Sequence, residues 1–166
     1  MEYVYVSNLN NVDELLIKCL REWVKGIYHS YNPIPILNFL LSKYKISKTS
    51  IPIDDFMKHV VVSTVKKHDF KFPCCCTVGS CCTVGISEQR ILSMLYNVQN
   101  KNYDMVNLLV GQLFDKKYYK IAYLCSELIC RDFNEVGLFF NNSKKIIEHN
   151  ALDNIIKYDF KNKKFL

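Results

Sequence analysis

The sequence predicts an all-α, single-domain protein of about four stacked helical hairpins, with a small cysteine-rich β-hairpin inserted after the third helix. Three observations lead to this fold class. Apolar residues recur at helical spacing through most of the 166 residues, and only five glycines and four prolines interrupt them. A related helical phrase also returns at intervals of about thirty residues, as in stacked helical repeats. A chain of this length is expected to hold one domain with a substantial core.

The first predicted unit covers approximately residues 11–46. Asn11 and Glu14 have the spacing of a capping box, and the apolar residues after them predict a helix. Residues 31–33, Tyr-Asn-Pro, predict a turn, and a second helix is expected to end near Lys45. The apolar positions of the two helices are Leu15, Leu16, Cys19, Leu20, Trp23 and Ile27, then Ile36, Leu37, Phe39, Leu40 and Leu41.

The second predicted unit covers approximately residues 52–85 and contains the predicted insertion. Pro52 opens a third helix that is expected to stop around His68. Beyond it, two Cys-Cys-Thr-Val segments flank Gly79 and Ser80, a pair suited to a type II′ turn between two short strands. The apolar face of the third helix is expected to hold Phe56, Met57, Val60, Val61 and Val65, with Thr64 beside them.

The third and fourth predicted units cover approximately residues 87–114 and 115–141. Ser87 is expected to cap the first helix of one hairpin, and Asp115 to open the next hairpin. The second helix of the fourth unit is expected to carry Val136, Leu138, Phe139 and Phe140. A final helical segment, residues 143–158, is expected to cap the stack.

The recurring phrase is the basis for predicting repeats. Residues 102–109 (NYDMVNLL) are echoed by residues 132–139 (DFNEVGLF), and more loosely by residues 34–40 (IPILNFL). Aligning Tyr103 with Phe133 also brings the preceding helices into register, so both helices of the unit recur. The alternative is an irregular helical bundle in which similar spacings arise by chance.

The charge pattern favours a solvated surface over a nucleic-acid-binding face. The formal net charge is +6, but Arg21, Arg90 and Arg131 are the only arginines. Base and phosphate recognition relies on the planar arginine side chain, so we do not expect nucleic acid as a partner. A possible exception is the set of lysines near the end of the sequence, Lys157, Lys161, Lys163 and Lys164.

The apolar segments predict neither secretion nor a membrane span. The first six residues lack both a basic flank and an apolar stretch of signal-peptide length, and residues 60–62 form only a short apolar run. We therefore expect a soluble intracellular protein with no membrane partner. The eight cysteines are then expected to be reduced thiols, either packed as small apolar groups or bound to metal.

One group of residues has the composition of a metal site. Thiolates bind zinc tetrahedrally, but adjacent cysteines cannot easily direct both sulfur atoms at one ion, so packed thiols are the favoured interpretation and no cofactor is expected. The candidate zinc ligands are Cys74, Cys76, Cys81, Cys82 and His68. No phosphate-binding loop, zinc-protease helix or serine elbow is present in the sequence, and we expect no enzymatic activity.

A basic and aromatic cluster is the best candidate for a protein-binding site. Large amphipathic rings contribute strongly to interfaces, and lysines around them keep the surface solvated. The alternative is an ordinary solvated helix start. The candidate residues are Tyr118, Tyr119, Lys116, Lys117 and Lys120.

Residues 102–109 and 132–139 resemble the second helix of degenerate ankyrin repeats. Together with a sequence rich in lysine, asparagine, tyrosine and isoleucine, these phrases are similar to the multigene-family proteins of African swine fever virus over about residues 87–141. The Thr-Pro-Leu-His tetrapeptide of regular ankyrin units is absent. The resemblance implies a non-enzymatic virulence or host-range factor in the host cytoplasm that affects cell tropism and innate immune signalling.

The expected function is therefore to bind a host protein and block its normal contacts. One alternative is a Bcl-2-like viral regulator of apoptosis or NF-κB signalling, which would bind an amphipathic helix in a groove. Such a globule would enclose one central helix, whereas stacked repeats would be elongated. The sequence predicts no central buried helix and contains no groove motif of the Asn-Trp-Gly-Arg type, so this alternative ranks second. A second alternative is a zinc-dependent nucleic-acid-binding protein.

Overall fold

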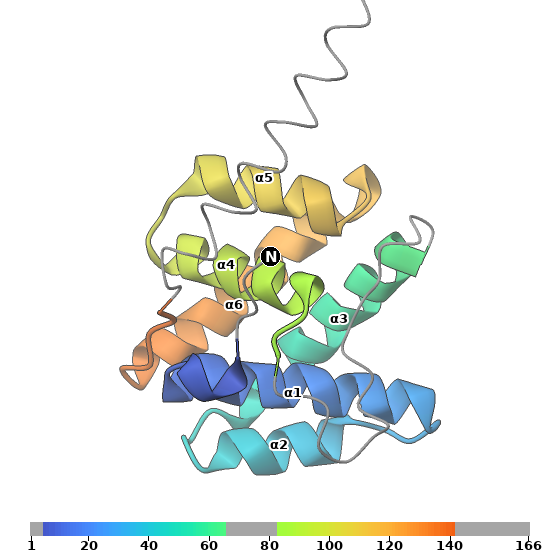
Figure 1. The fold of residues 1–166 in the computed structure, drawn as a ribbon, viewed down its shortest axis with the longest axis vertical. Helices are drawn as coiled ribbons and strands as arrows, with labels where there is room; N and C mark the ends of the chain where they lie inside the picture. Colours follow the sequence, from blue (N-terminus) through green and yellow to red (C-terminus); the bar gives the residue numbers. More distant parts are fainter. Residues whose placement is uncertain (1–4, 66–82, 142–166) are drawn as a thin grey trace, which may run out of the picture.

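The computed structural model describes residues 5–65 and 83–141, and both ranges are predominantly helical (Figure 1). This confirms the all-α class for the described part of the chain, where Tyr5 and Thr83 form only an isolated antiparallel bridge. The predicted cysteine-rich hairpin falls almost entirely outside these ranges, as does the predicted cap at 143–158. The α-helices are α1 Asn11–Tyr28, α2 Ile34–Ser42, α3 Ser50–Val65, α4 Ile86–Gln99, α5 Tyr103–Leu113 and α6 Tyr119–Glu135. The 3-10 turns are η1 Val6–Asn8, η2 Ser47–Thr49 and η3 Lys116–Tyr118.

Two helix starts differ from the predicted caps by one or two residues. The Asn10 side chain accepts a hydrogen bond from the Asp13 backbone N–H at 2.7 Å, so Asn10 caps α1 and Asn11 lies inside the helix. In α4 the cap position is Gly85, whose N–H donates to Glu88 Oε2 at 2.8 Å. Ser87 therefore lies within the first turn and does not cap the helix.

Four helices end in the same way, with one residue in the left-handed region. The residues are Ser30 (φ 58°), Lys45 (φ 63°), Lys101 (φ 56°) and Gly137 (φ 72°). In each case the next N–H bonds back to a carbonyl five residues earlier, as in Asn102 N to Asn97 O at 2.9 Å. These closures make short turns and allow consecutive helices to fold back on each other.

Helix α4 lies between other helices and is not at an end of the described body. In Figure 1 the α1–α2 hairpin lies at one end of the described body and α5 at the other, with α4 and α6 between them. Helix α4 packs against α1, α5 and α6. Residues 91–95 of α4 are all buried, and five successive residues cover more than one full helical turn. Helix α4 is therefore enclosed on every side over this segment.

The second helix predicted for the fourth unit is wrong. One helix, α6, runs through Phe133 to Glu135, and the chain after Gly137 is not helical up to residue 141. Phe133 is completely buried in the last turns of α6 and stacks on Phe140 with ring centroids 5.0 Å apart. Tyr103, its predicted equivalent, begins α5 and exposes 50% of its surface. The two phrases occupy unlike surroundings, which removes the main support for equivalent repeats.

Helix α3 connects the two ends of the body through hydrogen bonds at three levels. Near its start, Thr49 Oγ1 donates to Asp132 Oδ2 of α6 at 3.0 Å. In its first half, Asp54 Oδ1 accepts from Trp23 Nε1 of α1 at 2.8 Å. Towards its end, Ser63 Oγ accepts from the Asp115 N–H at 3.1 Å. The first two bonds fix the first half of α3 relative to α6 and α1, and the third fixes its end relative to Asp115, directly before η3.

Candidate functional site

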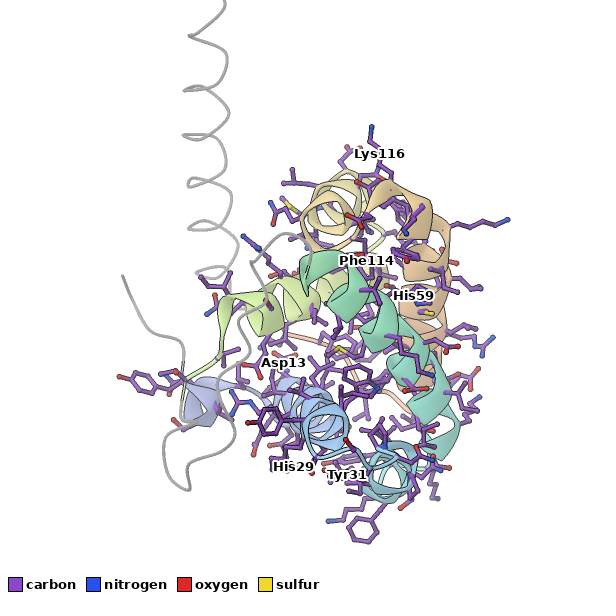
Figure 2. All side chains as sticks on the ribbon, turned by 90° about the vertical axis from the view of Figure 1, so that its right-hand side faces the viewer. Asp13, His29, Tyr31, His59, Phe114 and Lys116 are labelled. Carbon is purple, nitrogen blue, oxygen red and sulfur yellow. The ribbon has the colours of Figure 1, made fainter. Side chains whose placement is uncertain are left out.

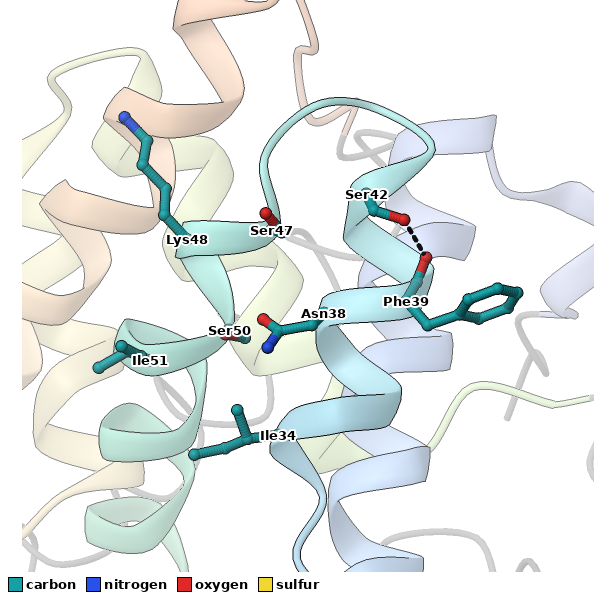
Figure 3. A pocket seen from close by; sticks show the side chains of 8 residues that line it. All are labelled: Ile34, Asn38, Phe39, Ser42, Ser47, Lys48, Ser50 and Ile51. Atoms are coloured by element: carbon teal, nitrogen blue, oxygen red, sulfur yellow. Dashed lines mark hydrogen bonds between the residues drawn. The ribbon is translucent and has the colours of Figure 1, made fainter.

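A shallow groove of about 590 Å³ lies between α2 and the segment that leads into α3 (Figure 3). Helix α2 forms one wall, while η2 and the first residues of α3 form the other. The groove is open to solvent along one side. It is lined by Ile34, Asn38, Phe39, Ser42, Ser47, Lys48, Ser50 and Ile51.

Half of the groove-lining residues are polar and uncharged, namely Asn38, Ser42, Ser47 and Ser50. Figure 3 shows the Asn38 amide directed from α2 toward Ser50, while the Phe39 ring points to the opposite side of α2. The Ser42 hydroxyl donates to the Phe39 carbonyl at 2.8 Å. No side-chain hydrogen bond joins Asn38 or Ser47 to another residue in the described ranges, so both remain available to a ligand.

Lys48 and the loop before it make one rim of the groove basic. Lys48 Nζ lies 3.1 Å from Glu135 Oε2 and 3.3 Å from Asp132 Oδ1, and these hydrogen bonds, led by that of Glu135, raise the pKa of Lys48. Lys43 and Lys45 are exposed on the loop between α2 and η2, and Lys43 Nζ lies 5.3 Å from the centre of the Phe39 ring. None of the groove-lining residues carries a carboxylate.

Two exposed apolar side chains lie on the helices that form the groove, Ile51 at the start of α3 and Phe39 on the side of α2 that faces away from the groove. Ile51 exposes 59% of its surface and Phe39 exposes 64%. On the opposite face of α2, Leu37 and Leu41 are completely buried against the core, which fixes the helix in place. The tight α1–α2 turn adds to this, because a Cβ at Gly26 would come within 2.9 Å of Pro33 Cβ. Such a surface can bind a partner without rearranging.

The predicted basic and aromatic cluster is contiguous, but its rings face partly inward. Lys116, Lys117 and Lys120 are exposed, and Figure 2 shows Lys116 projecting from the body. Tyr118 and Tyr119 are half-buried and pack against the core. The Tyr118 ring packs edge-on against His59 with ring centroids 4.9 Å apart, and Lys117 Nζ lies 4.6 Å from the centre of the Tyr118 ring. The cluster therefore presents cations rather than free aromatic rings.

The candidate zinc ligands Cys74, Cys76, Cys81, Cys82 and His68 lie outside the described residues. Within residues 5–65 and 83–141, no three histidine, cysteine, aspartate or glutamate side chains are grouped so as to hold a metal ion.

The three described cysteines are buried thiols with raised pKa values. Burial raises the pKa of Cys19 and Cys130 to about 12 and that of Cys125 to about 11. Thiol nucleophiles need the thiolate form, so these side chains are held in their least reactive state. We predict that iodoacetamide will leave all three unmodified in the native protein and will modify them after denaturation, as read by peptide mass spectrometry. Native-state labelling at any of the three would contradict their burial.

Asp13 is a buried carboxylate that should make stability depend on pH. It exposes 2% of its surface, and burial raises its pKa from 3.8 to about 6, opposed by the Asn141 N–H that donates to Oδ1 at 3.2 Å. Because the folded state holds this proton more tightly than the unfolded state, stability is expected to fall as pH rises from about 4 to 6. Asp13→Asn keeps an acceptor for Asn141 and should raise the free energy of unfolding by about 2 kcal/mol at pH 7.

Urea unfolding of the wild type and of Asp13→Asn at pH 4 and pH 7 tests this expectation. The free energy of unfolding of Asp13→Asn should exceed that of the wild type at pH 7, and the two values should be nearly equal at pH 4. A variant that is less stable at pH 7 would show that the ionised carboxylate stabilises the fold.

Sequence reasoning missed the groove as a site. Ile51 and Ile34 sit at helix starts, where an apolar residue is usually read as part of the core, and nothing in the local pattern signals that Ile51 is exposed and Ile34 only partly buried. The only available signal was the short spacing between α2 and α3, which brings residues 34–42 beside residues 47–51.

None of the described helices combines the length and the apolarity needed to cross a bilayer. Comparison of the chain with protein-family models, with curated proteins and with solved structures gave no match in any of the three.

Proposed function

We propose that the protein acts by binding another protein rather than by catalysis, and that the groove with its rim is the contact surface. The observation that carries this proposal is the exposure of Ile51 and Phe39 on the two helices that flank the groove. Exposed apolar side chains next to a concave, polar-rimmed surface are a common feature of interaction sites. The described thiols, held in the protonated form, add no nucleophile that would favour a reaction.

We propose a host protein as the partner, bound in the host cytoplasm, with an effect on cell tropism, virulence or innate immune signalling. Support for this setting comes from the resemblance to the African swine fever virus multigene-family proteins. One of the two phrases behind that resemblance, residues 102–109, begins at the cap of α5 after a short turn, as a second repeat helix would. Residues 132–139 instead span the end of α6, so only residues 102–109 support the ankyrin-like part of the resemblance.

A second candidate is a Bcl-2-like regulator of apoptosis or NF-κB signalling. The observation that favours it is the enclosed segment of α4, because a globule with one central helix was the feature expected of that class. This candidate is also a protein binder, and it would receive an amphipathic helix from its partner. The choice between the two candidates depends on the identity of the partner.

Affinity capture from a cell extract tests the proposed function when matched surface variants are compared. Ile51→Asp places a charge in the groove, and Leu108→Asp places one on α5 at the far end of the molecule, where Leu108 is 45% exposed. We expect the wild type and Leu108→Asp to retain the same protein, and Ile51→Asp to lose most of it. Equal retention by all three would contradict the groove as the contact surface, and a chain that retains nothing would contradict a binding function.

A further inference from the structure

We propose that the groove between α2 and the start of α3 binds a short segment of the partner protein that carries carboxylates beside apolar side chains. This inference rests on the proposed function and assigns the chemistry of the partner at the same site.

The apolar part of the segment is assigned by Ile34 and Ile51. They line the groove from its two walls, Ile34 from α2 and Ile51 from the first turn of α3. Covering them with an apolar side chain removes exposed hydrocarbon from water, which is worth about 25 cal/mol for each Å². One or two apolar residues of the partner would lie here.

The hydrogen-bond donors that line the groove indicate which polar groups the partner segment carries. The Asn38 amide and the Ser47 hydroxyl have no hydrogen-bond partner among the described residues, and both line the groove beside the Lys48 stem. Amide, hydroxyl and ammonium groups together donate to oxygen acceptors, whereas no lining carboxylate is present to accept from a cationic ligand. Backbone carbonyls and carboxylates of a peptide match this set.

The rim favours a negatively charged occupant. Lys43 and Lys45 lie on the loop at one end of the groove, and no ion pair to a described carboxylate involves either of them. Lys48 is already paired with two carboxylates, the exposed Glu135 and the buried Asp132, so the unpaired positive charge of the rim comes from Lys43 and Lys45. Nearby lysines speed the association of an acidic segment and disfavour a basic one.

The openness and size of the groove favour a peptide over a small metabolite. A volume of about 590 Å³ lies within the range of pockets that hold ligands, but the site is open along one side, and the exposed Phe39 ring lies on the opposite side of α2. A ligand that contacts the groove, the lysine loop and this ring must extend beyond the groove.

Selection from a displayed library of random linear peptides on the full chain tests this inference. We expect the enriched peptides to combine Asp or Glu with Leu, Ile, Val, Phe or Met. A synthetic peptide of the enriched sequence should bind the Ile51→Asp variant at least about tenfold more weakly, and likewise the Lys43→Glu/Lys45→Glu variant, with Leu108→Asp unchanged. Ile51→Asp should still fold, because Ile51 is mostly exposed and an acidic residue is favourable in the first turn of a helix.

The outcomes separate the inference from the proposed function. Enriched peptides that are basic, or that bind Ile51→Asp as tightly as the wild type, would overturn the assignment of an acidic occupant to this groove. If those peptides still displaced the captured partner, the binding function would stand at another surface. No enrichment at all would count against both, and thermal unfolding of each variant shows whether a loss of binding reflects loss of the fold.

Discussion

Replacing Arg21 by alanine is expected to lower the free energy of unfolding by about 3 to 5 kcal/mol. The Arg21 guanidinium makes two hydrogen bonds to Glu88, with Nε to Oε1 at 2.7 Å, and a further one to the Thr83 carbonyl at 2.8 Å. The Glu88 side chain is fully buried, so removing its partner leaves an uncompensated charge inside the protein. The contact also joins α1 to the start of α4, which the same carboxylate caps through Gly85.

A double-mutant cycle with Arg21→Ala, Glu88→Gln and both together isolates this pair. The double variant should cost clearly less than the sum of the two single variants, because it no longer contains the buried carboxylate that Arg21→Ala alone leaves without a partner. Chemical denaturation measures each value. A loss of less than about 1 kcal/mol for Arg21→Ala would show that Glu88 is solvated or paired in another way.

The second large effect is expected at Phe133, where alanine should lower the free energy of unfolding by about 3 to 5 kcal/mol. Phe133 is completely buried, and its removal would leave a cavity beside Phe140 at the junction of α6 with the chain that follows. Tyr103→Ala should cost less than about 1 kcal/mol, since half of that side chain is already in water.

The comparison of Phe133→Ala with Tyr103→Ala also tests the arrangement of the helices. Equivalent repeats would place these two residues in matching environments and would give similar losses. If chemical denaturation gave equal losses for both variants, the result would contradict the unlike surroundings of Phe133 and Tyr103 and restore the repeat interpretation.

The sequence predicted several helices well because nearby residues, such as a capping asparagine and a regular apolar face, determine where those helices begin and end. Helix α1 follows from an asparagine at its start and an apolar face that ends in the turn at Pro33, and α5 begins directly after Asn102, which accepts the Met105 N–H. Residues 132–139 were wrongly predicted to begin a second helix, because polar residues followed by spaced apolar residues can also occur where a helix ends. Whether Phe133 begins one helix or ends another depends on its packing against Phe140, and the spacing of residues in the sequence does not predict this contact.

The site was harder to predict because it depends on which apolar residues stay exposed. Tyr118 and Tyr119 were selected for their composition, yet the packing of α6 turns both rings partly inward. Ile51 has the same composition as a core residue, and it is exposed only because α3 directs Ile53, Phe56 and Met57 to the interior instead. The unpredicted part of the site is therefore the part set by tertiary packing.

Hydrogen exchange of the full chain, with and without the partner retained in affinity capture, tests the central claim most directly. Binding in the groove should slow exchange of backbone amides between Ile34 and Ile51, in α2 and at the start of α3, and should leave α5 unchanged. Protection confined to α5 and η3, with none along α2, would contradict the assignment of the binding surface.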